Sequence, residues 1–147
     1  MPSLSPNAKW LGYAGLLPQL FAIAMLLDDS GLRWIAIAGG YGYAAFIFSF
    51  LGGMWWGLGI ASANPPRWLF AAAIAPSLIS LVTYLPWTWG WDWPVPSLWI
   101  VATGLLLSPL VDMALGKSVT LPGGWLRQRI LMSSGLSLMT AVLAIAG

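Results

Sequence analysis

The chain contains no cysteine and no histidine. Without cysteine it forms no disulfide and offers no thiolate nucleophile, and without histidine it lacks the commonest general base near neutral pH. Zinc sites of the usual kind and histidine-ligated haem are excluded for the same reason. We therefore expect no catalytic residue, no metal site and no cofactor held by a side chain.

Charged residues are also scarce. Six Lys or Arg and four Asp or Glu make up 7% of the 147 residues, whereas soluble domains carry about 25%. Hydrophobic residues reach 59% and the mean hydropathy is +0.83, so lipid is the expected solvent. The net charge of +2 is too small and too scattered to indicate binding of nucleic acid.

Long apolar runs dominate the rest of the sequence, and five of them are separated by short polar or proline-containing turns. Each is expected to be a transmembrane helix, because about 20 residues cross a hydrocarbon core of about 30 Å. The predicted spans are residues 8–27, 34–62, 68–85, 97–115 and 126–146. Pro18, Pro76 and Pro109 fall inside spans and predict kinks. The expected fold class is an all-α integral membrane protein, a five-helix bundle forming one domain over residues 1–147.

The basic residues predict an orientation for this bundle. With five spans, the N-terminus and the second and fourth loops share a side, and that side carries Lys9, Arg67, Lys117, Arg127 and Arg129. The opposite side has only Arg33, near Asp28 and Asp29, plus Asp92. Because cytoplasmic loops are enriched in Lys and Arg, the N-terminus is predicted to be cytoplasmic and the C-terminus periplasmic. The expected location is the bacterial inner membrane or its equivalent.

A row of small residues runs along the second span at intervals of four: Ala45, Ser49, Gly53, Gly57 and Ala61. Residues four apart share a helix face, and a GxxxG pair lets another helix approach closely. Packing against neighbouring helices of the same bundle is the favoured interpretation. The alternative is a docking groove for the helix of a partner.

Tryptophan gathers at two places, namely Trp55 and Trp56 in the second span and Trp87, Trp89, Trp91 and Trp93 in the third loop. An extended loop would point the four alternate tryptophans the same way, as an amphipathic paddle at the headgroup level. Interfacial anchoring is the favoured interpretation for both groups. Contact with a neighbouring subunit, a bound lipid, a quinone or a pigment is the alternative.

Asp112 is the one carboxylate within a predicted span, and ionisable groups inside a membrane are by default functional candidates. Lys117, Arg127 and Arg129 lie close along the chain on the same predicted side. An intramembrane ion pair of Asp112 with these arginines is favoured over a proton or ion relay, because a relay needs several acidic groups in series.

Several short motifs are similar to those of a known family. They are LGYAGLLP at 11–18, YAA at 43–45, SFLGGMWWG at 49–57, Asp112, and 122–129. In them the chain resembles the membrane-protein family catalogued as domain of unknown function 3429, relatives of the animal mitochondrial transmembrane protein 69. The resemblance covers most of the chain and implies an inner membrane of bacterial or mitochondrial type, without an established activity. Relatives often have a histidine where this chain has Trp55, so any chemistry of that histidine is missing here.

Function is the least determined property. The leading hypothesis is a non-catalytic accessory or assembly subunit that packs against other integral membrane subunits of a larger complex, of respiratory or photosynthetic kind. The alternative is a small transporter or channel that uses Asp112. A membrane enzyme acting on lipid ranks third, because the chain has no recognisable nucleophile motif. Membrane lipids are expected partners in every case.

Overall fold

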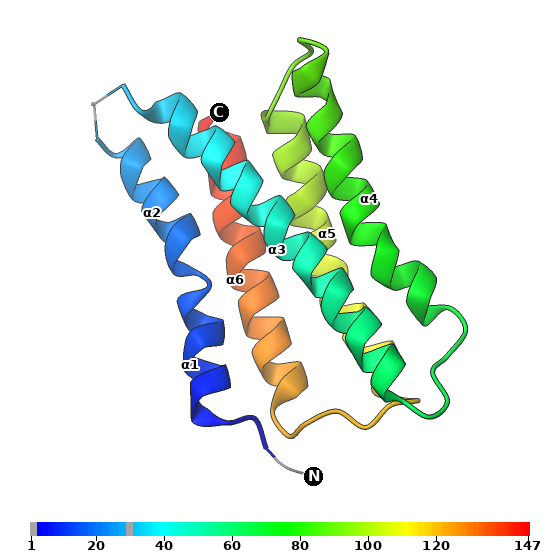
Figure 1. Ribbon diagram of the computed structural model, residues 1–147. Helices are drawn as coiled ribbons and strands as arrows, with labels where there is room; N and C mark the ends of the chain where they lie inside the picture. Colours follow the sequence, from blue (N-terminus) through cyan, green and yellow to red (C-terminus); the bar gives the residue numbers. More distant parts are fainter. Residues whose placement is uncertain (1–2, 29–30) are drawn as a thin grey trace.

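The computed structural model describes residues 3–28 and 31–147 as a helical bundle (Figure 1). Its elements are α1 Pro6–Ala14, α2 Leu17–Leu26, α3 Arg33–Ala61, α4 Leu69–Thr88, α5 Val95–Leu115 and α6 Trp125–Ala146. Within the described residues, five helical stretches are long and apolar enough to cross a membrane, with α1 and α2 together forming the first. The predicted all-helical architecture, with five helical stretches long and apolar enough to span a membrane, is therefore confirmed.

The first span is broken rather than kinked. Helix α1 ends at Ala14 and α2 begins at Leu17, so that Pro18 falls in the first turn of α2. A proline there removes no helical hydrogen bond, because the first N–H groups of a helix have no partner within it. The hydroxyl of Tyr43 on α3 donates to the carbonyl of Gly15 at the break, which satisfies an acceptor left free there. Pro76 and Pro109 do lie inside α4 and α5.

Helix α3 crosses the bundle diagonally, with α1 and α2 on one side of it and α4 on the other (Figure 1). Helices α5 and α6 run side by side behind α3, and the α5–α6 and α3–α4 interfaces are the most extensive. The N-terminal end of the chain and the C-terminus lie at opposite ends of the bundle. The α3–α4 and α5–α6 loops lie at the end where α1 begins.

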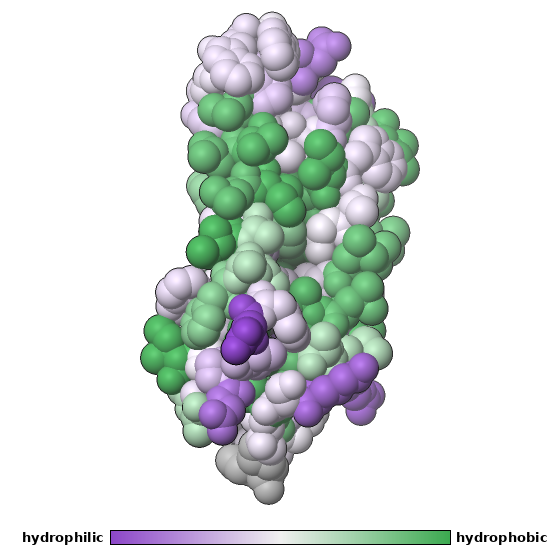
Figure 2. Space-filling model, turned by 90° about the vertical axis from the view of Figure 1, so that its right-hand side faces the viewer, coloured by the Kyte–Doolittle hydropathy of each residue, from purple (hydrophilic) through white to green (hydrophobic). Residues whose placement is uncertain are grey.

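The interior is packed around α3, α5 and α6. Ala44, Leu98, Leu105 and Leu143 are fully buried, while large apolar side chains such as Phe46 remain exposed on the outside. Figure 2 shows an apolar surface over the middle of one face, with hydrophilic residues concentrated toward the two ends. This distribution suits a bundle whose sides face hydrocarbon and whose ends face water.

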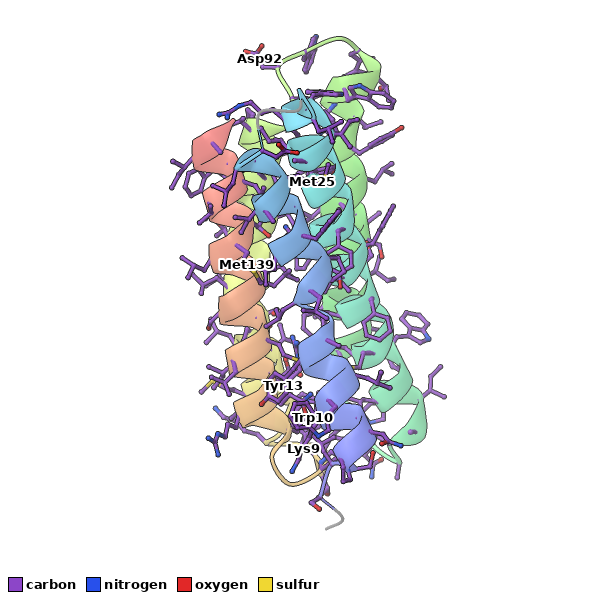
Figure 3. All side chains as sticks on the ribbon, turned by 90° about the vertical axis from the view of Figure 1, so that its left-hand side faces the viewer. Lys9, Trp10, Tyr13, Met25, Asp92 and Met139 are labelled. Carbon is purple, nitrogen blue, oxygen red and sulfur yellow. The ribbon has the colours of Figure 1, made fainter. Side chains whose placement is uncertain are left out.

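The predicted separation of charges is visible in this arrangement. Lys9 lies near one end and Asp92 at the other (Figure 3). Lys9, Arg67, Lys117 and Arg127 are all exposed, and the helix order puts them at the end of the bundle where α1, the α3–α4 loop and the start of α6 meet. We call this the basic end.

Candidate functional site

A buried ion pair joins α5 to α6 near the basic end. Nε of Arg129 donates to Oδ2 of Asp112 at 3.1 Å, and the Asp112 side chain has no exposed surface. Asp112 lies three residues before the end of α5, and Arg129 is the fifth residue of α6. At about 1.5 Å per residue, both lie about one turn inside the bundle. The structure thus brings together one of the two predicted pairs.

Arg127, the other predicted partner of Asp112, is exposed. It precedes Arg129 by two residues, and two helical positions differ by about 200° around the axis at 3.6 residues per turn. When Arg129 points into the bundle, Arg127 must therefore point away from it. The prediction that both arginines pair with Asp112 is wrong for Arg127.

Two indole groups complete the hydrogen bonding of Asp112. Its Oδ1 accepts from Nε1 of Trp125 at 3.0 Å and from Nε1 of Trp55 at 3.2 Å. Trp125 and Arg129 are four residues apart and so share a face of α6, while Trp55 reaches the carboxylate from α3. The carboxylate thus connects three helices, α3, α5 and α6.

The prediction of Trp55 as an interfacial anchor is therefore wrong. Its side chain is 2% exposed and points into the bundle, whereas the adjacent Trp56 is 40% exposed and packs edge-on against Phe70 of α4, with ring centroids 4.9 Å apart. Successive helical residues differ by about 100° in direction, so two adjacent tryptophans cannot both face lipid fully. The buried Trp55 needs a partner for its N–H, and Asp112 supplies it.

Serine hydroxyls extend the network. Nη2 of Arg129 donates to Oγ of Ser108 at 3.1 Å, and Ser108 shares a 3.0 Å hydrogen bond with Ser133 of α6. Asp112 and Ser108 are four residues apart on α5, so both face Arg129. The Asp112 carboxylate accepts three hydrogen bonds, one of them from the cation Arg129, and so links α3, α5 and α6. Among the described residues no group of three or more acidic side chains could hold a metal ion.

The row of small residues divides into two parts. Ala45 is buried, and its carbonyl accepts from Ser80 of α4, whose Oγ also accepts from Ser49 at 3.2 Å. Gly53, Gly57 and Ala61 are exposed. A Cβ added at Gly53 or Gly57 would have no neighbour within 4 Å. The favoured interpretation, packing within the bundle, is therefore wrong for Gly53, Gly57 and Ala61.

Close packing of α3 on α4 depends instead on Gly52 and Gly59. A Cβ at Gly52 would collide with the backbone carbonyl of Ala73, and one at Gly59 would lie 2.9 Å from Leu69 Cδ2 and 3.0 Å from Phe70 Cε1. Both glycines are buried. The sequence has four glycines within eight residues here, and only the position of α4 determines which two of them pack against it.

The tryptophans of the third loop do not form an extended paddle, so that prediction is wrong. Helix α4 continues to Thr88 and contains Trp87, and Gly90 turns the chain with a φ of 72°. Trp93 folds inward, donating from Nε1 to the carbonyl of Thr83 at 3.1 Å and packing edge-on against Tyr41. The three outward tryptophans are Trp87, Trp89 and Trp91, which are 51%, 60% and 65% exposed.

Gln19 is a buried polar residue that the sequence analysis did not identify. Gln19 of α2 has no exposed surface, and its Nε2 donates to Thr140 Oγ1 on α6 at 2.8 Å and to the carbonyl of Gly40 on α3 at 3.1 Å. The only signal is an amide in an otherwise apolar run, since a polar residue inside a membrane span must find internal partners. Its hydrogen bonds join α2, α3 and α6, and Thr140 lies six residues before the end of α6.

With this geometry in hand, comparison with known proteins yields one assignment. A family model described as "Protein of unknown function (DUF3429)" matches residues 4–145. The chain therefore belongs to this family, as its motifs suggested. No match was found among the curated proteins or among the solved structures.

Proposed function

We propose that this member of the family is a non-catalytic accessory or assembly subunit that packs against other subunits of a larger membrane complex. One observation carries the proposal, namely that Gly53 and Gly57 face out of the bundle with open space where a Cβ would be. Glycine in the interior of a helix is less favourable than alanine by about 1 kcal/mol. Nothing that α3 does within the described chain requires that cost at these two positions.

The surroundings of the two glycines support a helix as the partner. Phe46 and Phe50 precede them on the outward face of α3 and are 74% and 65% exposed, and Ile60 follows at 70%. Bulky side chains therefore flank a hollow at Gly53 and Gly57. In lipid, helices associate through such close backbone approach, because hydrocarbon supplies no hydrophobic drive. We name Gly53, Gly57 and Ala61 the outward glycine face.

The proposal includes a location and an orientation. The four exposed basic side chains at the basic end support a cytoplasmic N-terminus and a periplasmic C-terminus, in a bacterial inner membrane or its equivalent. The outward tryptophans Trp87, Trp89 and Trp91 would then anchor the periplasmic end. Reporter fusions to each terminus, active on only one side of the membrane, test this orientation.

Transport through Asp112 is the weaker alternative. Its carboxylate accepts two indole hydrogen bonds and pairs with Arg129, so it has no exposed surface for an ion or proton to reach. In reconstituted vesicles, a flux that Asp112→Asn abolishes in a correctly folded protein would favour transport over the subunit role.

The decisive experiment is extraction of the tagged chain from its native membrane in mild detergent, followed by native sizing and mass spectrometry. We expect a stoichiometric partner, namely other membrane subunits of a respiratory or photosynthetic complex. Gly57→Leu should remove it. Gly39→Leu is the matched control, because Gly39 is also exposed with open space around it, lies 18 residues earlier in α3 and shares the angular direction of Gly57. A partner-free wild-type particle would refute the subunit role, and a Gly57→Leu variant that keeps its partner would refute the outward glycine face as the surface of contact.

A further inference from the structure

A groove between α1, α3 and α6 opens near the basic end. It measures about 370 Å³, and its wall includes Ala8 and Leu11 of α1, Phe50 of α3, and Gln128 and Arg129 of α6. Helix α1 packs against α6, and the lower half of α3 is separated from α1, with α6 between them (Figure 1). We call this opening the α1–α3–α6 groove.

The groove has a polar end and an apolar end. Gln128 and Arg129 are the fourth and fifth residues of α6, so they lie about one turn inside the basic end. Toward the middle of the bundle the groove meets a smaller cavity of about 70 Å³, which shares Ile47 with it and extends to Leu16 and Leu136. This inner space is lined mainly by apolar side chains. The two spaces together suit a molecule whose polar end lies near the membrane surface and whose hydrocarbon lies deeper.

Gln128 carries an acceptor without a donor. Its Nε2 donates to the carbonyls of Ala8 at 3.3 Å and Lys9 at 3.4 Å, and these two acceptors fix the orientation of the amide because only its nitrogen can donate. The side chain is about nine-tenths buried, and within the described residues its Oε1 has no hydrogen-bond partner. A buried acceptor without a partner is unfavourable, so a ligand in this groove that supplies a donor is favoured.

Arg129 adds donors without acceptors. Its guanidinium carries five N–H groups, and Nε and Nη2 use one each on Asp112 and Ser108. The other three meet no acceptor in the described part of the chain, although the side chain is only 8% exposed. Because Asp112 already neutralises the charge of Arg129, the matching acceptor is an uncharged oxygen, and a second buried anion would be costly.

One chemical group satisfies both residues. A hydroxyl donates one hydrogen bond and accepts others, so its O–H can donate to Gln128 Oε1 while its oxygen accepts from the adjacent Arg129. Ester, ketone and ether oxygens only accept, and acyl tails do neither, so none of these would pair with Oε1. A water molecule has suitable hydrogen-bonding groups, but it makes no use of the apolar walls that extend toward the middle of the bundle.

We propose that the α1–α3–α6 groove binds one neutral lipid whose polar end is a hydroxyl group. The hydroxyl lies between Gln128 and Arg129, and the hydrocarbon runs past Ile47 toward the inner cavity at Leu136. Long-chain alcohols and diacylglycerols share this chemistry. The site is independent of the outward glycine face, so it stands whether or not the chain is a subunit of a complex.

The test compares an alcohol with its methyl ether, which keeps the accepting oxygen and the hydrocarbon chain but has no donor. The full chain is reconstituted in vesicles that contain hexadecanol and its methyl ether in equal amounts, then extracted in mild detergent, and the lipid bound per chain is quantified by mass spectrometry. We expect one hexadecanol per chain, retained about tenfold more strongly than the ether, as one hydrogen bond allows. Equal retention of the two, or retention of neither, would overturn the proposal.

Two glutamine variants locate the hydrogen bond. Gln128→Met removes the acceptor and keeps the length of the side chain, so the alcohol and the ether should be retained equally. Gln19→Met is the matched control and should keep the tenfold preference, because Gln19 is also buried with an unpaired Oε1 but does not line the groove. The preference is a ratio within one sample, so a general loss of stability does not imitate the result. A preference that survives Gln128→Met, or that both variants remove equally, would overturn the assignment.

Two tryptophan variants test the groove itself. Ala8→Trp fills the groove from the exposed side of α1 and should abolish retention of hexadecanol, whereas Ala71→Trp on the exposed surface of α4 should leave it intact. Each variant is first shown by thermal unfolding to be folded, and if Ala8→Trp does not fold, the comparison of alcohol and ether decides. Unchanged retention by a folded Ala8→Trp variant would place the lipid elsewhere and overturn the proposal.

Dioleoylglycerol in place of hexadecanol then distinguishes the two sources of the hydroxyl. Its retention, with the same dependence on Gln128, assigns a diacylglycerol to the groove. If hexadecanol is retained and dioleoylglycerol is not, the occupant is a single-chain alcohol. Both results support a hydroxyl-bearing neutral lipid.

Discussion

Replacing Asp112 with asparagine measures what the buried ion pair contributes to stability. The change keeps the size and shape of the side chain and removes its charge. If the amide oxygen continues to accept from Trp55 and Trp125, the amide nitrogen must face Nε of Arg129, now 3.1 Å from Oδ2. Two donors would then oppose each other, and the guanidinium would remain buried without its counterion.

The expected loss is large. Breaking a buried pair by removing one partner costs about 3–5 kcal/mol. For a chain of about 150 residues, each kcal/mol lowers the unfolding temperature by about 2–4 °C, so Asp112→Asn should lower it by about 10 °C. Asp92→Asn is the control, because Asp92 is exposed at the opposite end and should change stability by less than about 0.5 kcal/mol.

The assay is unfolding of the purified protein in one detergent, followed by tryptophan fluorescence. Arg129→Gln and the double variant Asp112→Asn with Arg129→Gln complete a cycle. In the double variant the asparagine amide can donate to the glutamine oxygen, so the two losses should overlap by about 2–3 kcal/mol. The reasoning is refuted if Asp112→Asn unfolds within about 2 °C of wild type, or if the two single losses simply add.

Two neighbouring pairs of residues give further predictions. Gly52→Ala should destabilise the isolated protein by about 1–3 kcal/mol, because the added Cβ meets the Ala73 carbonyl. Gly53→Ala should instead stabilise it by up to about 1 kcal/mol, because the added Cβ has open space. Thermal unfolding of both variants in the same detergent checks this, and equal effects would contradict it. Trp55→Phe should lower the free energy of unfolding by about 1–3 kcal/mol, because Asp112 loses a buried donor. Trp56→Phe should lower it by less than about 0.5 kcal/mol, because Trp56 is 40% exposed. The reverse order in denaturant unfolding would contradict the role of Trp55 as a donor to Asp112.

The five spans could be predicted because hydrophobicity and length are properties of each segment alone. A run of about 20 apolar residues must become a helix in lipid, whatever its neighbours are. The ends were less well placed: α4 continues through Pro86 to Thr88, and the first span divides into α1 and α2 before Pro18. Where a helix ends depends on the partners its terminal groups find, such as Tyr43 at Gly15.

The buried charge could be predicted in part. An acidic residue in a span with arginines nearby must find a partner, so the pairing of Asp112 with Arg129 follows from the cost of burying a charge. The indole donors could not be predicted, because Trp55 is 57 residues away along the chain and reaches Asp112 only through the packing of α3 on α5.

The sequence by itself determined that the chain is helical, has five segments long and apolar enough to cross a membrane, belongs to its family, and has one acidic side chain inside such a segment that must be paired. These follow from composition and from the energy of burying charge and backbone in lipid. Only the tertiary structure decided that Gly52 and not Gly53 meets α4, that Trp55 points inward beside an outward Trp56, and that α1 leaves a groove along α3. Adjacent residues on a helix differ by about 100° in direction, so which of them is buried depends on where the other helices lie.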